Sequence, residues 1–246
     1  SFTVGFQKLG GNTIELKSND IGFGKRETYE DILKTLSQFI DVLMIRNDDH
    51  KIIKQLSSLN TLPIINGLWD YSHPCQILSD VFTFEELRGN IFNKTISWLG
   101  DANNNMSNSL IEAAGKFKFK LNIGCPDKYK PSKNIMLWAK KNKANITITK
   151  NPTEAVKNVD CVMTDKWVSM NDRVDKKKKK KVLKNFQVNK KIMKLAKSDA
   201  IFMHCLPVGR GEEATDEVVD GKQSVVWTQA LNRVHTQKSI INWCLS

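Results

Sequence analysis

Short apolar runs alternate with amphipathic stretches through most of this sequence of 246 residues. Runs such as 95–99 and 161–164 are apolar almost without interruption. That pattern is typical of parallel strands that are covered on both faces. The longer stretches between the runs repeat their apolar residues at helical spacing. This alternation of strands and helices predicts an α/β fold with mostly parallel sheets.

The same pattern gives the expected elements. Strands are expected at 41–46, 62–65, 95–99, 120–123, 146–149, 161–164, 200–203 and 224–227. Helices are expected at 27–39, 76–87, 103–116, 131–141 and, at the end of the sequence, about 228–245. Residues 1–11 also have helical character, and the Gly10-Gly11 pair is a typical helix stop.

So many strands favour two α/β domains, each with its own mostly parallel sheet flanked by helices, over one large sheet. Arg88-Gly89-Asn90 is the best boundary, because a long predicted helix ends there and a new strand follows. The last helix is expected to pack back on the first domain. We therefore predict a first domain of residues 1–88 completed by 228–246, and a second domain of residues 89–227.

The sequence is basic, with 38 Lys+Arg against 26 Asp+Glu and a net charge of +12. Half of that excess lies in one run, Lys176 to Lys181, which merges into a helical pattern and has no aromatic residue beside it before Phe186. A nucleic-acid surface would need cations spread over a face, with aromatic platforms. A solvated helix face is the favoured interpretation, a polyanion contact is the alternative, and nucleic-acid binding is not expected.

The cysteines and the hydropathy bear on location. Five widely spaced cysteines form no Cys-x-x-Cys pair, and the four histidines do not join them at zinc spacing. Reduced thiols in the cytoplasm fit this pattern better than disulfides do, and no metal site is predicted. No run approaches the ~18–20 apolar residues of a membrane span.

Polar clusters follow five of the predicted strands, where ligands bind in open α/β sheets. The clusters are Arg46, His73-Pro74-Cys75-Gln76, Gly100–Asn105, Asp165 with Ser169-Met170, and His204-Cys205-Leu206-Pro207. Each has a purely structural alternative: a surface ion pair at Arg46, a helix start at Pro74, a helix cap at Asn104 or Asn105, turn and cap residues at Asp165 and Ser169, or a small buried thiol at Cys205. Their recurrence at five strand ends favours a binding site.

Four motifs, in this order, resemble the ornithine carbamoyltransferases of the aspartate/ornithine carbamoyltransferase family. They are Ile65-Asn66-Gly67…His73-Pro74-Cys75-Gln76, Asp165-x-Trp167-Val168-Ser169-Met170, Phe202-Met203-His204-Cys205-Leu206-Pro207 and Asn232-Arg233-x-His235-x-Gln237. The resemblance covers essentially the whole sequence. The related aspartate carbamoyltransferases usually carry Thr in place of Cys75 and Leu-Pro-Arg in place of Cys-Leu-Pro, so ornithine is the expected acceptor.

The resemblance implies transfer of a carbamoyl group from carbamoyl phosphate to the δ-amine of L-ornithine, giving citrulline and phosphate in arginine biosynthesis. It further implies a homotrimer of two-domain subunits and no metal or organic cofactor. Carbamoyl transfer to another amine such as putrescine is one alternative. A truncated, non-catalytic paralogue that acts as a binding protein is another.

The resemblance also assigns residues to roles. Those expected to contact carbamoyl phosphate are Arg46, His73, Gln76, Cys205, Leu206 and Arg233. Within this set, the expected catalytic residues are Arg46, His73, Cys205 and Arg233. Those expected to hold ornithine are Asn105, Asp165, Ser169 and Met170. The side-chain chemistry agrees, since guanidinium groups match phosphate oxygens and a carboxylate matches an α-ammonium group.

Two departures from the family pattern stand out. The family carries a phosphate-binding Ser-x-Arg-Thr-Arg motif just before a Ser-Phe-x-Val stretch, and Ser1-Phe2-Thr3-Val4 is the first stretch here. We therefore expect an N-terminally truncated sequence, and weak carbamoyl-phosphate binding in any protein without that motif. Asn171 stands where the family usually has Gly.

Overall fold

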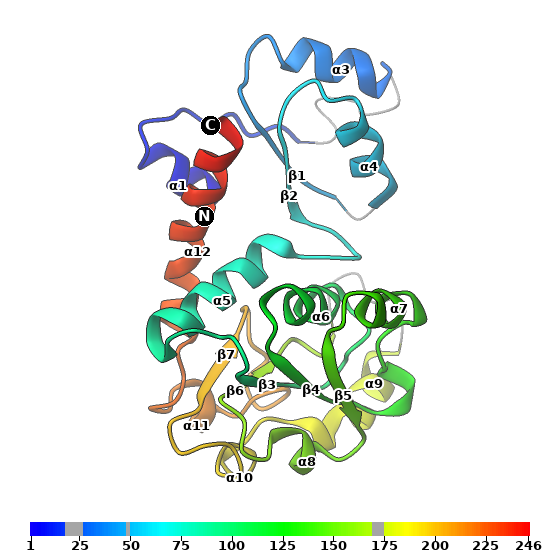
Figure 1. Ribbon diagram of the computed structural model, residues 1–246, viewed down its shortest axis with the longest axis vertical. Coiled ribbons are helices and arrows are strands. Elements are labelled where there is room, and N and C mark those ends of the chain that lie inside the picture. The colour runs from blue at the N-terminus through cyan, green and yellow to red at the C-terminus, as the bar shows by residue number, and fades with distance from the viewer. Residues whose placement is uncertain (18–26, 48–49, 169–174) are drawn as a thin grey trace. The chain divides into compact units, whose positions relative to one another are not determined.

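The computed structural model describes residues 1–17, 27–47, 50–168 and 175–246 (Figure 1). The chain divides into two compact units. Unit 1 comprises Ser1–Leu78 and Arg233–Ser246, and unit 2 comprises Ser79–Asn232. Both divisions fall inside helices, namely α5 (Pro74–Arg88) and α12 (Val226–Leu245). The predicted boundary at Arg88 instead coincides with the end of α5.

Unit 1 is built around two parallel strands, β1 (Leu43–Arg46) and β2 (Ile64–Leu68), with Leu43 opposite Ile64. Its helices are α1 (Phe2–Gln7), α3 (Tyr29–Leu36), α4 (His50–Ser58), the start of α5 and the end of α12. Ile65, Cys75 and Ile241 form a buried cluster against which Phe2 and Phe6 pack. The final helix therefore packs on the first part of the chain, as predicted.

Unit 2 contains a five-stranded parallel sheet in the order β5-β4-β3-β6-β7. Its strands are β3 (Thr95–Leu99), β4 (Lys120–Gly124), β5 (Asn145–Thr149), β6 (Cys161–Thr164) and β7 (Ile201–His204). Its helices, besides the shared α5 and α12, are α6 (Asn105–Phe117), α7 (Lys133–Lys141), α8 (Pro152–Val156), α9 (Lys176–Leu183), α10 (Lys190–Met193) and α11 (Asp216–Val219). The 3₁₀ turns Asp127–Tyr129 and Lys184–Phe186 complete this unit.

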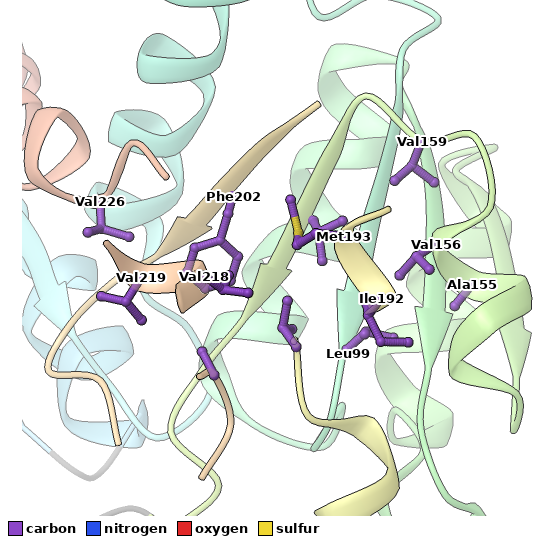
Figure 2. Packing of buried hydrophobic residues seen from close by; sticks show 13 residues of the cluster. Leu99, Ala155, Val156, Val159, Ile192, Met193, Phe202, Val218, Val219 and Val226 are labelled. Atoms are coloured by element: carbon purple, nitrogen blue, oxygen red, sulfur yellow. The ribbon is translucent and has the colours of Figure 1, made fainter. Parts of the chain in front are cut away.

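Helices cover both faces of this sheet, with α6 and α7 on one side and α8 on the other (Figure 1). On the α8 side, Leu99, Val162 and Phe202 from three strands pack against α8, α10 and α11 (Figure 2). On the opposite face, Val81 and Phe84 of α5 line a small apolar pocket with strand residues. Burial of strands on both faces explains their continuous apolar sequence, and the predicted α/β class is confirmed.

One predicted strand is wrong. In the run 224–227, Ser224 makes a single parallel bridge to Phe202, and α12 already begins at Val226. The amide of Gln229 donates to the Val225 carbonyl at 2.8 Å, so the segment turns helical after one bridge. A four-residue apolar run does not distinguish a strand from a helix start by periodicity.

The lysine run forms α9, as its helical pattern indicated, but one lysine differs from a solvated face. Lys176, Lys177 and Lys178 are exposed, whereas Lys179 is buried. None of the helices in the described part of the chain has the length and apolar character that a membrane crossing requires.

Candidate active site

Four of the predicted site residues belong to unit 1 and lie on or beside its parallel strands and their helices. Arg46 is the last residue of β1, and Arg233 is the first residue of unit 1 on α12. His73 directly precedes α5, and Gln76 lies in its first turn, where both are buried. Pro74 opens the helix, where its missing N–H is not needed, so this structural prediction is confirmed.

The turn before α5 is held by its own hydrogen bonds. The Trp69 amide donates to the Ser72 carbonyl at 2.9 Å, and the Asn66 side chain donates to Ser72 Oγ at 3.1 Å. The amides of Gln76 and Ile77 donate to the His73 carbonyl at 3.2 and 3.3 Å. These bonds fix where the His73 imidazole sits at the helix start.

His73 lies in a cationic environment. Burial, followed by the charges of Arg233 and Arg46, lowers the pKa of His73 from 6.5 to about 3. The imidazole is therefore neutral near pH 7, so it can donate a hydrogen bond without adding a charge. Two guanidinium groups beside the N-terminus of a 15-residue helix form a ready anion site.

Cys75, in the same turn, is a structural thiol. Its Sγ donates to the Asn66 carbonyl at 3.2 Å, and burial raises the pKa of Cys75 to about 11. A thiol with that pKa is not a nucleophile near neutral pH.

The other described site residues lie in unit 2, at the carboxyl ends of its strands. β3 and β6 are neighbours, and the chain leaves them toward opposite edges of the sheet. This reversal is where open α/β sheets bind ligands. Asn105 follows β3 and Asp165 follows β6 at this point, while Cys205 follows the adjacent β7.

Local hydrogen bonds place Asn105 at the start of α6. Asn104 is the N-cap and exchanges bonds with Ser107: the Ser107 amide donates to Asn104 Oδ1 at 2.8 Å, and the Asn104 amide donates to Ser107 Oγ at 3.2 Å. The capping prediction is therefore confirmed for Asn104. Asn105 is the first residue of α6 and not its cap.

Asp165 and Cys205 are in contact. Cys205 Sγ donates to Asp165 Oδ1 at 3.2 Å, and the Lys166 amide donates to the same oxygen at 2.7 Å. Burial raises the pKa of the Asp165 carboxyl above its ordinary value, although the nearby His204 and these two bonds oppose the rise. A cationic ligand group beside Asp165 would favour its charged form.

A buried pair supports the strand end that carries Cys205. His204 Nε2 lies 3.4 Å from Glu213 Oε1, and both side chains are fully buried. The Leu206 amide donates to His204 Nδ1 at 2.9 Å, so Nε2 carries the proton of the neutral ring. Burial alone would raise the pKa of Glu213, but hydrogen bonds from His204 and the Gly209 amide outweigh it, and the pKa lies below its ordinary value.

Leu206 has a left-handed backbone, with φ of 58°, and the Leu206–Pro207 peptide bond is cis. A β-region conformation is the usual one for a residue before proline, so the positive φ of Leu206 depends on its surroundings. The hydrogen bond from Leu206 to His204 is one of the contacts that hold it.

Two supporting residues were not found from the sequence. Glu213 lies in a charged loop that has the composition of exposed surface, and Gln229 accepts from the His204 amide at 2.9 Å across 25 residues of sequence. Both residues are recognised only by the partners that they contact in the structure, and no spacing in the sequence predicts those contacts.

One cluster has donor atoms of the kind that bind metals. Asp165, His204 and Cys205 each offer an atom, and these atoms lie within 4.8 Å of one another. The cluster is also bonded internally, since Cys205 donates to Asp165 and His204 accepts from Leu206. These protein contacts account for the arrangement of all three groups.

The structure thus groups Arg46, His73, Gln76 and Arg233 in unit 1, and Asn105, Asp165, Cys205 and Leu206 in unit 2. Ser169 and Met170, with Asn171, lie outside the described residues. One unit offers an anion site, and the other offers a carboxylate and a thiol at a sheet switch point. These features define a two-domain α/β protein with candidate ligand-binding groups in each domain.

Comparison with known proteins identifies the family. Residues 1–86 match the carbamoyl-P binding domain of aspartate/ornithine carbamoyltransferase, and residues 93–244 match its Asp/Orn binding domain. The chain therefore belongs to the aspartate/ornithine carbamoyltransferase family.

Individual relatives carry the ornithine name. The chain is 51% identical over 245 residues to ornithine carbamoyltransferase from Rhodopseudomonas palustris, covering 100% of this chain and 78% of that protein. It is similar to the solved structure of ornithine carbamoyltransferase from Pyrococcus furiosus, with a TM-score of 0.91 and 39% identity over 98% of this chain and 78% of the other. The enzyme from Burkholderia thailandensis gives a TM-score of 0.88 at 38% identity, over 99% of this chain and 79% of the other.

Proposed function

We propose that this protein transfers the carbamoyl group of carbamoyl phosphate to the δ-amine of L-ornithine, giving citrulline and phosphate. The observation that carries the proposal is the neutral His73 flanked by Arg46 and Arg233 at the N-terminus of α5. It lies in the part of the chain that matches a carbamoyl-P binding domain. The similarity to ornithine carbamoyltransferases over the whole chain supports ornithine as the acceptor.

In the carbamoyl-phosphate half, each side chain has a distinct task. Arg46 and Arg233 offer forked donors to the phosphate and carbonyl oxygens. His73 donates to the carbonyl oxygen as it gains negative charge in the tetrahedral transition state. The Gln76 side-chain carbonyl accepts from the carbamoyl NH₂ group, which orients the planar amide.

In the acceptor half, Asp165 binds the α-ammonium of ornithine, and Asn105 binds its α-carboxylate. Ser169 and Met170 are proposed to complete this half, while Cys205 and Leu206 contact the carbamoyl group where the two substrates meet. The Cys205 thiol donates to Asp165 in the free protein, so the incoming ammonium takes over part of that interaction.

The reaction forms a bond between the δ-nitrogen and the carbamoyl carbon and breaks the bond from that carbon to the phosphate oxygen. The δ-amine must lose a proton to attack, and with a pKa of ~10.4 this costs roughly 4 kcal/mol near pH 7.4. The free amine then attacks, and the departing phosphate takes the second proton, which the nitrogen loses as the new bond forms, so no protein general base is required. Positioning and oxyanion stabilisation supply the catalysis.

The test is a citrulline assay on the full-length protein with ornithine and putrescine side by side. We expect citrulline and phosphate to appear in equal amounts with ornithine, and little product with putrescine. Asn105 is the reason for this preference, because putrescine keeps the second ammonium that Asp165 would bind but has no α-carboxylate for Asn105 to bind. Faster turnover of putrescine would overturn the choice of acceptor, and no product with either amine would overturn the proposed function.

We further propose a cytoplasmic homotrimer that acts in arginine biosynthesis, as the family resemblance implies. All five cysteines are free, and burial raises the pKa of Cys75 and Cys125 to about 11, which suits a reducing compartment. Light scattering on the full-length protein as it elutes from a size-exclusion column should give three times the subunit mass. A monomer at micromolar concentration would contradict the trimer.

A further inference from the structure

One member of the lysine run is buried against the acceptor half of the site. Lys179 Nζ lies 2.7 Å from Asp101 Oδ2, and the two side chains are only 7% and 8% exposed. The same ammonium lies 5.4 Å from the centroid of the Tyr129 ring, within cation–π range. Helix phase explains the choice, because Lys179 is one turn before the buried Leu183 and shares its face.

Asp101 organises the turn between β3 and α6. Its Oδ1 accepts from the Asn103 amide at 2.8 Å, while its carbonyl accepts from Trp98 Nε1 at 3.0 Å and from Asn104 Nδ2 at 3.1 Å. Lys179 therefore neutralises a carboxylate whose other oxygen defines the turn. Asn104 then caps α6, and Asn105 follows it directly.

Tyr129 and Trp167 also contact the turn between β3 and α6. The Ala102 amide donates to the Tyr129 carbonyl at 2.9 Å. Gly100 has φ of +116°, a backbone conformation that strains other residues, and a Cβ there would lie 3.2 Å from Trp167 Nε1. Glycine therefore lets this turn approach Trp167, the residue two positions after Asp165, closely. Tyr129, Trp167 and Leu183 belong to one buried cluster. The Lys179–Asp101–Tyr129 group thus contacts the turn before Asn105, and its Tyr129 belongs to the same cluster as Trp167, which follows Asp165 by two residues.

We propose that Lys179 is a positioning residue for the acceptor half-site, which holds the Asp101 turn so that Asn105 faces the α-carboxylate of the acceptor amino acid. This inference rests on the proposed function. Burial of an ion pair is weak evidence for stability as such, because an apolar pair can replace it at little cost. Lys179 is buried between the exposed Lys178 and the half-buried Lys180, and its partner Asp101 shapes the turn before α6, so its role is geometric.

The run itself supplies a matched control. Lys179→Met removes the buried ammonium and keeps the length of the side chain, and Lys178→Met makes the same change at the exposed neighbour. In the full-length protein we expect Lys179→Met to raise the KM for ornithine about tenfold, the order expected when a hydrogen bond to a charged group is weakened. The KM for carbamoyl phosphate should change by less than about twofold, and Lys178→Met should leave both KM values unchanged. Equal changes in both KM values, or an unchanged KM for ornithine, would overturn the proposal.

A second variant covers the case in which Lys179→Met does not fold. The double variant Asp101→Asn with Lys179→Met has no unpaired buried charge, and the asparagine oxygen can still accept from Asn103. We expect this double variant to fold with the KM for ornithine still raised. If it folds and the parental KM returns, Lys179 does not act in positioning.

Hydrogen exchange separates this inference from the proposed function. Lys179→Met, or the double variant where the single one does not fold, should speed exchange of the Ala102 and Asn103 amides about tenfold or more, with Lys178→Met unchanged. If exchange is faster but the protein forms no citrulline, the role of Lys179 in holding the turn is supported and only the proposed function is rejected. Unchanged exchange would reject the contact whatever the activity.

Discussion

At the scale of single residues, the proposed roles of His73 and Asp165 require opposite charge states: His73 acts as a neutral imidazole, and Asp165 acts as a charged carboxylate. His73 is kept neutral by burial and by two guanidinium groups, so it enters the reaction as a hydrogen-bond donor. Burial also pushes Asp165 toward its neutral form, yet its proposed task requires the carboxylate. The ammonium group of the acceptor would supply the missing charge, so binding and ionisation of Asp165 are coupled.

His73 gives a prediction on stability and pH. Its pKa in the folded protein, about 3, is below the ordinary 6.5, so between these values the unfolded chain binds a proton that the folded protein does not. The free energy of unfolding therefore rises with pH across this window and falls again as the pH is lowered. The contribution of His73 to this slope is at most about 1.4 kcal/mol per pH unit. His73→Asn should flatten that slope in urea unfolding measured across the window. The exposed His235→Asn is the control, and an equal flattening there would contradict the assignment.

Asp165 gives a prediction on substrate binding. Asp165→Asn should raise the KM for ornithine by about 10- to 100-fold, because a hydrogen bond to a charged group is lost. The KM for carbamoyl phosphate should stay within about twofold. Steady-state kinetics with each substrate varied in turn would check this. The control is Asp127→Asn, an exposed carboxylate paired with Lys130 at 2.7 Å. Loss of carbamoyl-phosphate binding alone would mean that the half-sites are reversed.

At the scale of elements, α5 and α12 are joined by buried and partly buried hydrogen bonds in unit 2. Gln229 Nε2 donates to Asp80 Oδ1 at 2.7 Å, and Asn232 Nδ2 donates to Thr83 Oγ1 at 3.1 Å and to Glu86 Oε2 at 2.7 Å. Asp80 is one turn beyond Gln76 on α5, and Asn232 directly precedes Arg233 on α12. These bonds set the register of the two helices that carry much of the proposed carbamoyl-phosphate site.

Gln229 is the centre of this network, because it also accepts from the His204 amide. Gln229→Leu should lower the free energy of unfolding by about 2–4 kcal/mol, since a buried carboxylate loses a donor and a buried amide loses an acceptor. Urea denaturation would measure it. The exposed Leu231→Ala on the same helix should change stability by less than about 0.5 kcal/mol, and equal losses in the two variants would argue against a specific role for the network.

At the scale of the whole molecule, the sequence was sufficient for the α/β class and for most strands, because strands buried on both faces carry that burial in their composition. The sequence was misleading at 224–227, because the first residue of this apolar run makes a single β-bridge and its last two residues begin a helix. The positions of Asn104 and Pro74 followed from local chemistry. Lys179 and Gln229 did not, because each acquires its role from a partner far away in the sequence, such as Asp80, which lies 149 residues from Gln229. Glu213 did not either, because it lies in a turn where no regular helix or strand spacing predicts its partners His204 and Gly209.

The contribution of the exposed lysines to stability and activity can be tested at this scale. Lys176, Lys177 and Lys178 are exposed, so replacing all three with Gln should change the free energy of unfolding by less than about 0.5 kcal/mol and leave citrulline formation unchanged. Urea denaturation and the kinetic assay would check both. Loss of salt-sensitive retention on a nucleic-acid column in this variant would instead favour the polyanion interpretation of the run.

The two-part composition of unit 1 sets an order of events on the ribosome. Its core joins Phe2 and Ile65 to Ile241, and the whole of unit 2 is translated in between. At ~5–20 residues per second, the last helix emerges on the order of ten seconds or more after the strands that it covers. Unit 2 can close its sheet in that interval, whereas the nascent first part of unit 1 still exposes apolar side chains. That part is where a chaperone would bind the growing chain.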